Sequence, residues 1–151
     1  MRKEKHFLKE TEKKKTKDIL KKELSRYPEI IFAYLHGSFL LPVPCGDIDI
    51  AVYLENGALS RKPWEYEAKL AISLDHLVGL PVDVLTLNQA PVALRYHATR
   101  GEVLFSRDEP ARFAFLEETW REYFDCQPLF RAFLRDLLDT VDNHTSQGRK
   151  D

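Results

Sequence analysis

The stretch that decides the fold is residues 37–52, which read GSFLLPVPCGDIDIAV. It follows an apolar run at residues 30–35 that is rich in β-branched and aromatic side chains and predicts a buried strand. Gly37 and Ser38 end that strand, and we expect Ser38 to cap a short helix that the following prolines stop after about one turn. The chain then enters a second predicted strand at residues 47–54.

Two carboxylates open this second strand. Side chains alternate between the faces of a strand, so Asp47 and Asp49 share one face while Ile48 and Ile50 share the other. Neighbouring carboxylates repel each other and resist desolvation, and a divalent cation held between them removes both costs. Hard oxygen ligands of this kind suit Mg²⁺. The alternative is a strand edge exposed to water whose outward positions are occupied by aspartate.

A third carboxylate interrupts a later apolar run. Asp83 lies within residues 81–87, PVDVLTL, which predict another strand. If this strand is a neighbour in the sheet, about 4.8 Å away, Asp83 lies beside Asp47 and Asp49. The alternative is an edge-strand carboxylate that faces water.

The order of strand, Gly-Ser, short turn and Asp-x-Asp resembles the nucleotidyltransferase signature of the polymerase-β-like superfamily. The matching residues are Gly37, Ser38, Asp47 and Asp49. The interval between serine and the first aspartate is shorter than in the commonest form of the signature, and Gly46 replaces a residue that is often polar. The small size resembles the minimal nucleotidyltransferases, which are antitoxin partners of HEPN-domain toxins.

This resemblance extends over about residues 28–106 and implies an α+β fold, with helices packed on a small mixed four-stranded sheet. In the family a third acidic residue lies on a later strand, and Asp83 is the matching candidate. The three carboxylates would hold two Mg²⁺ ions about 3.5–4 Å apart. Gly37 would let the backbone approach the phosphates of ATP, and Ser38 would donate hydrogen bonds to them.

The reaction implied is attack by a hydroxyl on the α-phosphate of ATP, with pyrophosphate leaving. The resemblance implies that the acceptor is a tyrosine of a cognate HEPN ribonuclease toxin. Two alternatives stay open. One is adenylylation of a small hydroxylated molecule such as an aminoglycoside, and the other is a non-catalytic antitoxin that acts by binding.

Charge and hydrophobic periodicity divide the 151-residue chain into an N-terminal segment, a core and a C-terminal part. Residues 1–27 carry 11 Lys/Arg against 5 Asp/Glu and are expected to form a basic helical arm, with a helix at residues 11–25. We interpret this arm as a solvated helix rather than a nucleic-acid binder, because aromatic residues are not interleaved for base stacking. The nucleotidyltransferase core is expected at residues 28–106.

Beyond the core, two helices are predicted within residues 107–142, the second of them starting at Pro128. Their apolar stripes predict either cover for the open sheet face or a contact with another copy or a partner. Residues 143–151 are polar and are expected to be disordered.

The remaining features point to ordinary roles. Cys45 and Cys126 match neither a metal spacing nor a disulfide framework, and no run is apolar enough for a membrane span, so we expect a cytoplasmic protein. We interpret His36 as a packing residue. The predicted helix at residues 88–100 carries Arg95, His97 and Arg100. These residues are candidates to face a triphosphate, but we interpret them as ordinary surface charges and a satisfied histidine.

Overall fold

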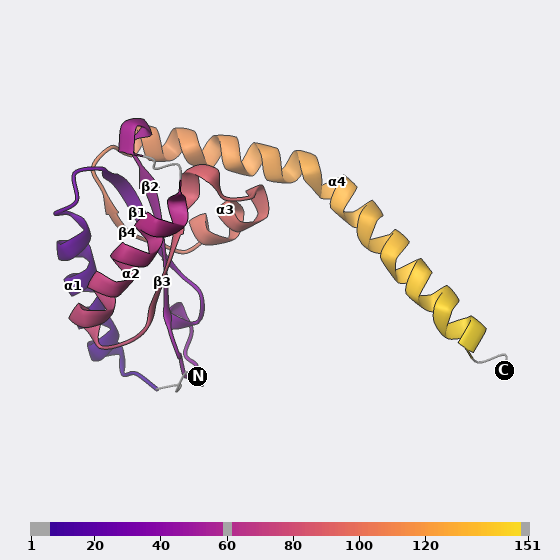
Figure 1. The fold of residues 1–151 in the computed structure, drawn as a ribbon, viewed down its shortest axis with the longest axis horizontal. Helices are drawn as coiled ribbons and strands as arrows, with labels where there is room; N and C mark the ends of the chain where they lie inside the picture. Colours follow the sequence, from indigo (N-terminus) through magenta and orange to yellow (C-terminus); the bar gives the residue numbers. More distant parts are fainter. Residues whose placement is uncertain (1–6, 59–61, 149–151) are drawn as a thin grey trace.

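Four strands form one mixed sheet in the order β3-β2-β1-β4 (Figure 1). The computed structural model describes residues 7–58 and 62–148. β1 pairs antiparallel with both β2 and β4, whereas β2 pairs parallel with β3. The strands span β1 (Ile30–His36), β2 (Ile48–Leu54), β3 (Val82–Thr86) and β4 (Glu102–Ser106). The predicted α+β fold with a mixed four-stranded sheet is therefore confirmed.

Helices α1 (Glu10–Leu24) and α2 (Pro63–Val78) pack on one face of the sheet. Alternate residues of β2 supply that face with apolar side chains, as the period of two predicts. Leu20 and Leu24 of α1 are fully buried there, so α1 is part of the packed domain rather than a separate basic arm.

Helix α3 (Val92–Thr99) and the start of α4 (Glu109–Gly148) cover the opposite face. The core on this side is aromatic: Phe32 of β1 stacks on Tyr53 of β2 at 4.8 Å between ring centroids, and Phe115 of α4 contacts both rings. The buried hydroxyl of Tyr34 accepts a hydrogen bond of 2.9 Å from Arg112 Nη1 of α4. The first turns of α4 are thus anchored to the sheet.

The two C-terminal helices of the sequence-based prediction are one. α4 runs from Glu109 to Gly148 with Pro128 inside it, and it includes residues 143–148, which we expected to be disordered. A proline removes one backbone hydrogen bond and bends a helix, and α4 changes direction along its length (Figure 1). The helix survives because this stretch is exposed and water can satisfy the released carbonyl group.

Local capping chemistry fixes the starts of two helices. Asp108 caps α4 through a 3.0 Å bond from the Ala111 backbone N–H, and Pro63 opens α2, where its missing N–H costs little. The sequence favours Ser60 as the cap of α2, and that residue lies outside the described residues. Cys45 and Cys126 are free thiols. No helix among the described residues is long and apolar enough to cross a membrane.

Candidate active site

Three carboxylates meet on the face of the sheet that α3 and α4 also cover. Asp49 of β2 and Asp83 of β3 are direct partners in the parallel register, so both side chains point to the same face. Asp47 precedes β2 by one residue, and carboxylate oxygens of Asp47, Asp49 and Asp83 lie within 4.8 Å of one another. Asp47 and Asp49 are half-buried, and Asp83 is exposed.

Gly37 lies against this cluster. Its φ is +83°, a conformation that L side chains rarely adopt, and an added Cβ would overlap the carboxylate oxygen Oδ2 of Asp49. The glycine therefore has two independent reasons to lack a side chain. It brings bare backbone against the carboxylates at the point where β1 ends.

Ser38 begins a single turn of 3-10 helix, η1 (Ser38–Leu40), closed by Leu41 N–H donating to Ser38 C=O at 3.0 Å. The prediction that Ser38 caps this turn is wrong, because Gly37 holds the N-cap position and no side-chain cap bond forms. The serine hydroxyl is consequently not committed to a capping bond.

An open depression of about 630 Å³ adjoins the Gly37–Ser38 turn. Its floor comes from β1 and η1, and its other side comes from the end of α3 and the turn that follows. The residues that line it are His36, Gly37, Ser38, Leu40, Leu41, His97, Arg100 and Gly101. Gly101 allows the approach, because an added Cβ would overlap the Leu35 carbonyl oxygen. Local sequence indicates only that Gly101 ends a helix, because its contact with β1 is tertiary.

The three polar residues of the α3 segment have different environments. Arg95 forms an ion pair of 2.7 Å with Glu122 of α4 and its side chain is only 13% exposed, so it joins α3 to α4 and is not the surface charge that the sequence predicted. Arg100 lies over the Tyr96 ring, 5.5 Å from its centroid, and lines the depression together with His97. Arg100 therefore supplies positive charge beside the Gly37–Ser38 turn.

His36 pairs with Asp49 across β1 and β2 and lines the depression. Its Nε2 atom is buried and has no hydrogen-bond partner among the described residues. Burial lowers the pKa of this imidazole, because the charged form loses solvation. The ring is therefore neutral at physiological pH and adds no charge next to the carboxylates.

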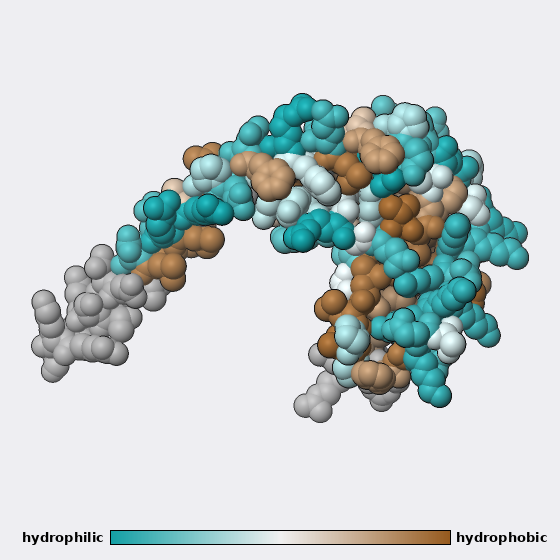
Figure 2. All heavy atoms as spheres, turned by 180° about the vertical axis from the view of Figure 1, so that it is seen from behind, coloured by the Kyte–Doolittle hydropathy of each residue, from teal (hydrophilic) through white to brown (hydrophobic). Residues whose placement is uncertain are grey.

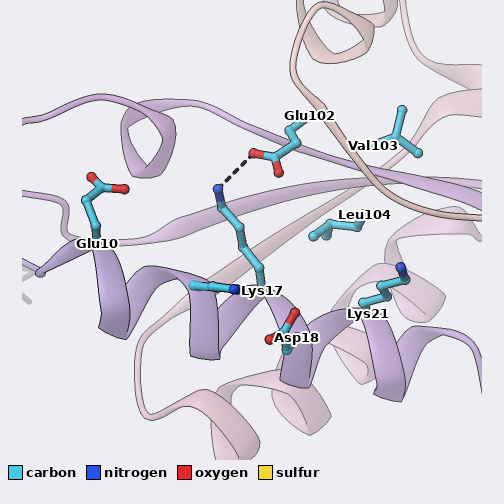
Figure 3. Close-up of a pocket in the computed structure, with 8 residues that line it drawn as sticks. Glu10, Lys17, Asp18, Lys21, Glu102, Val103 and Leu104 are labelled. Atoms are coloured by element: carbon cyan, nitrogen blue, oxygen red, sulfur yellow. Dashed lines mark hydrogen bonds and ion pairs between the residues drawn. The ribbon is translucent and has the colours of Figure 1, made fainter.

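A second hollow lies on the other side of the molecule, between α1 and β4 (Figure 3). Lys17 reaches across it to Glu102 of β4, with 2.8 Å between Nζ and the carboxylate oxygen. Lys13 is buried and donates to the Leu41 carbonyl oxygen at 2.8 Å. Part of the basic charge of the N-terminal segment is thus directed at the body of the protein itself.

The carboxylate cluster fits a divalent cation. Its donors are hard oxygens from three side chains, they lie within reach of a common centre, and backbone without a Cβ faces them at Gly37. Like charges gathered this closely repel each other, and a cation between them relieves that repulsion. The residues present therefore suit the metal site that the sequence predicted.

Comparison with known proteins agrees with this geometry. The family model "Polymerase beta, Nucleotidyltransferase" matches residues 17–110, which is more than half of the chain. The chain belongs to this nucleotidyltransferase family. The match includes the Gly37–Ser38 turn and all three aspartates. Members of this family act on nucleotides with a divalent metal, in keeping with the acidic cluster.

Solved structures of toxin–antitoxin complexes share the fold. One is a tri-AMPylated HEPN toxin with MNT antitoxin from Shewanella oneidensis, whose matching chain has 22% identity and a TM-score of 0.67, with coverage of 83% of this chain and 98% of that one. Another is a toxin–antitoxin complex with AMP-PNP, with 23% identity, a TM-score of 0.68, and coverage of 81% and 98%. A third, the MntA-HepT pair, has 21% identity, a TM-score of 0.63, and coverage of 86% and 99%. A search of curated proteins finds no significant sequence match.

Proposed function

We propose that this protein is an antitoxin that transfers AMP from ATP to a tyrosine hydroxyl of a cognate HEPN-domain toxin. The observation that carries the proposal is the convergence of Asp47, Asp49 and Asp83 next to the Gly37–Ser38 turn. Membership of the nucleotidyltransferase family supports the chemistry. The complexes of similar fold, one with an AMPylated toxin and one with AMP-PNP, support the acceptor and the nucleotide.

Asp47, Asp49 and Asp83 would hold two Mg²⁺ ions. When bound, such ions neutralise charge on the triphosphate and on the leaving pyrophosphate. Asp47 and Asp49 are half-buried at the start of β2 and would provide the ligands nearest the phosphates. Asp83 is the exposed member of the group, and we place the acceptor on its side.

The turn would bind the triphosphate tail. Gly37 lets the backbone approach without a side chain, and Ser38 offers its N–H and hydroxyl at the start of η1. Arg100, on the opposite side of the depression, would add positive charge toward the phosphates. These groups orient the α-phosphate, and most of the rate enhancement would come from such positioning and charge neutralisation.

The acceptor oxygen forms a bond to the α-phosphorus, and the bond from that phosphorus to the bridging oxygen breaks. Pyrophosphate leaves with the bonding electron pair. Asp83 is the carboxylate on the exposed side of the cluster and would accept the acceptor's proton. AMP then remains on the acceptor as a phosphodiester.

A partner protein is the acceptor that suits this chain best. The described residues form one small sheet with four main helices, and no additional domain encloses an acceptor pocket within them. An acceptor delivered on a partner needs no such pocket. Because the reaction consumes ATP, we place it in the cytoplasm.

A second candidate function is inhibition of the toxin by binding alone. It is favoured by the exposed apolar side chains of α4, which form a large surface for a partner. Replacing Asp47 and Asp49 with asparagine separates the two functions. Loss of toxin neutralisation with an intact complex supports catalysis, whereas neutralisation that persists supports binding.

A further inference from the structure

A groove lies between α3 and α4, next to the depression at Gly37–Ser38 and separate from the hollow between α1 and β4. It has a volume of about 440 Å³ and is lined mainly by apolar side chains and rings, among them Ala93, Tyr123, Phe133 and Leu134. His97 lines both this groove and the depression at Gly37–Ser38. The groove and the depression therefore adjoin each other at His97, which places the groove beside the Gly37–Ser38 turn.

The groove opens onto an apolar helix that nothing else in the described chain covers. We name residues 127–140 the C-terminal arm. Leu129, Phe133, Leu134, Leu137 and Leu138 of this arm are all roughly half exposed or more, between 47% and 72%. Figure 2 shows the arm extending beyond the body, with apolar side chains along the side that faces the hollow between arm and body. Covering these side chains would remove substantial apolar surface from water.

Charge borders the apolar stripe on one side. With about 100° of rotation per residue, Arg131 and Arg135 lie roughly 60° and 100° from Leu134, and Asp139 follows on the same flank at roughly 140°, one turn beyond Arg135. The flank is therefore basic at its groove end, where Arg131 lines the groove. A helix with acidic residues beside its apolar face would complement this arrangement.

We infer that an amphipathic helix of the acceptor protein docks in the α3–α4 groove and along the C-terminal arm. Docked there, the acceptor protein presents its hydroxyl to the carboxylates past His97. The inference rests on the proposed function, because it assumes that the acceptor is a protein. The mode is that of a helix laid into an apolar groove, which is a common way to bind a helical partner. Its acidic flank would face Arg131 and Arg135.

The test replaces Phe133 and Leu134 together with aspartate in the full-length chain. The matched control replaces Ile72 and Leu77 of α2, which are also exposed at 58% and 46% and lie on the other face of the sheet. The probe is the cognate HEPN-domain toxin that the proposed function assigns to this chain. We expect the groove variant to lose at least ten-fold in affinity for it and in AMP transfer to it. AMP-PNP binding and thermal stability should match the wild type, and the control should lose nothing.

A photo-crosslinking residue at position 134 gives a second readout that does not depend on catalysis. A crosslink from position 134 to a helix of the partner, with none from position 72, supports the inference. This holds even if the wild type transfers no AMP, because the lack of transfer would overturn only the proposed function. A groove variant that binds and modifies the partner as well as the wild type overturns the inference. So does a crosslink from position 134 to a second copy of this chain alone.

Discussion

Asp49 and Asp83 are direct partners on two parallel strands, although 34 positions separate them in the sequence. The whole of α2 lies between them in the chain. Parallel pairing in this register places both carboxylates on one face, beside the glycine that ends β1. The proposed catalytic cluster therefore depends on the register of β2 and β3 as much as on the residues themselves.

Replacing Asp49 or Asp83 with asparagine should abolish transfer without unfolding the protein. We expect AMP transfer to fall at least 100-fold, because the charge that holds the metal and the phosphates is reduced. The melting temperature without metal should stay equal or rise, because like-charge repulsion is relieved. Asp18→Asn on the exposed surface of α1 is the control and should change neither quantity. A cluster variant that retains full activity would contradict the assignment.

Mg²⁺ should stabilise the wild-type protein measurably. A ligand that binds only the folded state stabilises it by about 2.7 kcal/mol at 100 times its Kd. Differential scanning fluorimetry should show a rise in melting temperature with Mg²⁺ that EDTA reverses. The Asp49→Asn variant should show little of this rise. An equal rise in both proteins would place the metal elsewhere.

Gly37→Ala and Gly79→Ala form a matched pair of substitutions. Both glycines have positive φ, +83° and +72°, so alanine costs each of them about 1 kcal/mol or more of stability. Only at Gly37 does the new Cβ meet the Asp49 carboxylate, while nothing lies near Gly79. We expect both variants to melt earlier, and only Gly37→Ala to lose AMP transfer and AMP-PNP binding. Equal activity in the two variants would remove Gly37 from the site.

The anchored and the free parts of α4 should respond differently to substitution. Phe115→Ala removes a buried ring that contacts Phe32 and Tyr53, and should cost about 3–5 kcal/mol of unfolding free energy. Leu138→Ala changes a side chain that is 62% exposed and should cost less than about 0.5 kcal/mol. Urea denaturation measures both values. Similar losses would mean that the C-terminal arm packs on the body in solution.

Acid should weaken the anchor between α4 and the sheet. Hydrogen bonds from Arg112 and from Ser106 hold the pKa of Glu109 below its ordinary value of 4.5. Arg112 also donates to the Tyr34 hydroxyl and so links Glu109 to the sheet. A lowered pKa in the folded state means that this stabilisation is present above pH 4.5 and is lost as the pH falls below it. Glu109→Gln should therefore lower the melting temperature at pH 7 and have a smaller effect at pH 3. An effect that is the same at both values would exclude this charge contribution.

The sequence predicted the parts of the site that depend on local pattern. Strand alternation placed Asp47 and Asp49 on one face, and the apolar run around Asp83 predicted the strand that pairs beside them. For Arg100, sequence alone left open a phosphate contact and favoured a surface charge, and nothing in the chain indicated the contact of Gly101 with β1. The contributions of both residues depend on how the end of α3 packs against β1, and no spacing in the chain encodes that contact.

The C-terminal helix shows where local rules fail. Pro128 was interpreted as the start of a new helix, because proline disrupts a helix interior. In the structure α4 continues through it, since an exposed helix loses only one backbone hydrogen bond there and apolar residues at helical spacing follow. The sequence could not decide what covers the apolar stripe of this helix. A helix face buried in the chain's own core and one buried by a partner have the same pattern of apolar residues.

The most direct test of the account uses ATP labelled either at its α-phosphate or at its γ-phosphate. Each is incubated with this protein, Mg²⁺ and the cognate HEPN-domain toxin that the proposed function requires, and the labelled protein is identified. The account predicts that α-label appears on a tyrosine of the partner with the wild type and not with Asp49→Asn, and that γ-label is never transferred. Transfer of γ-label, or a partner that stays unlabelled by both while the complex forms, would contradict nucleotidyl transfer to the toxin.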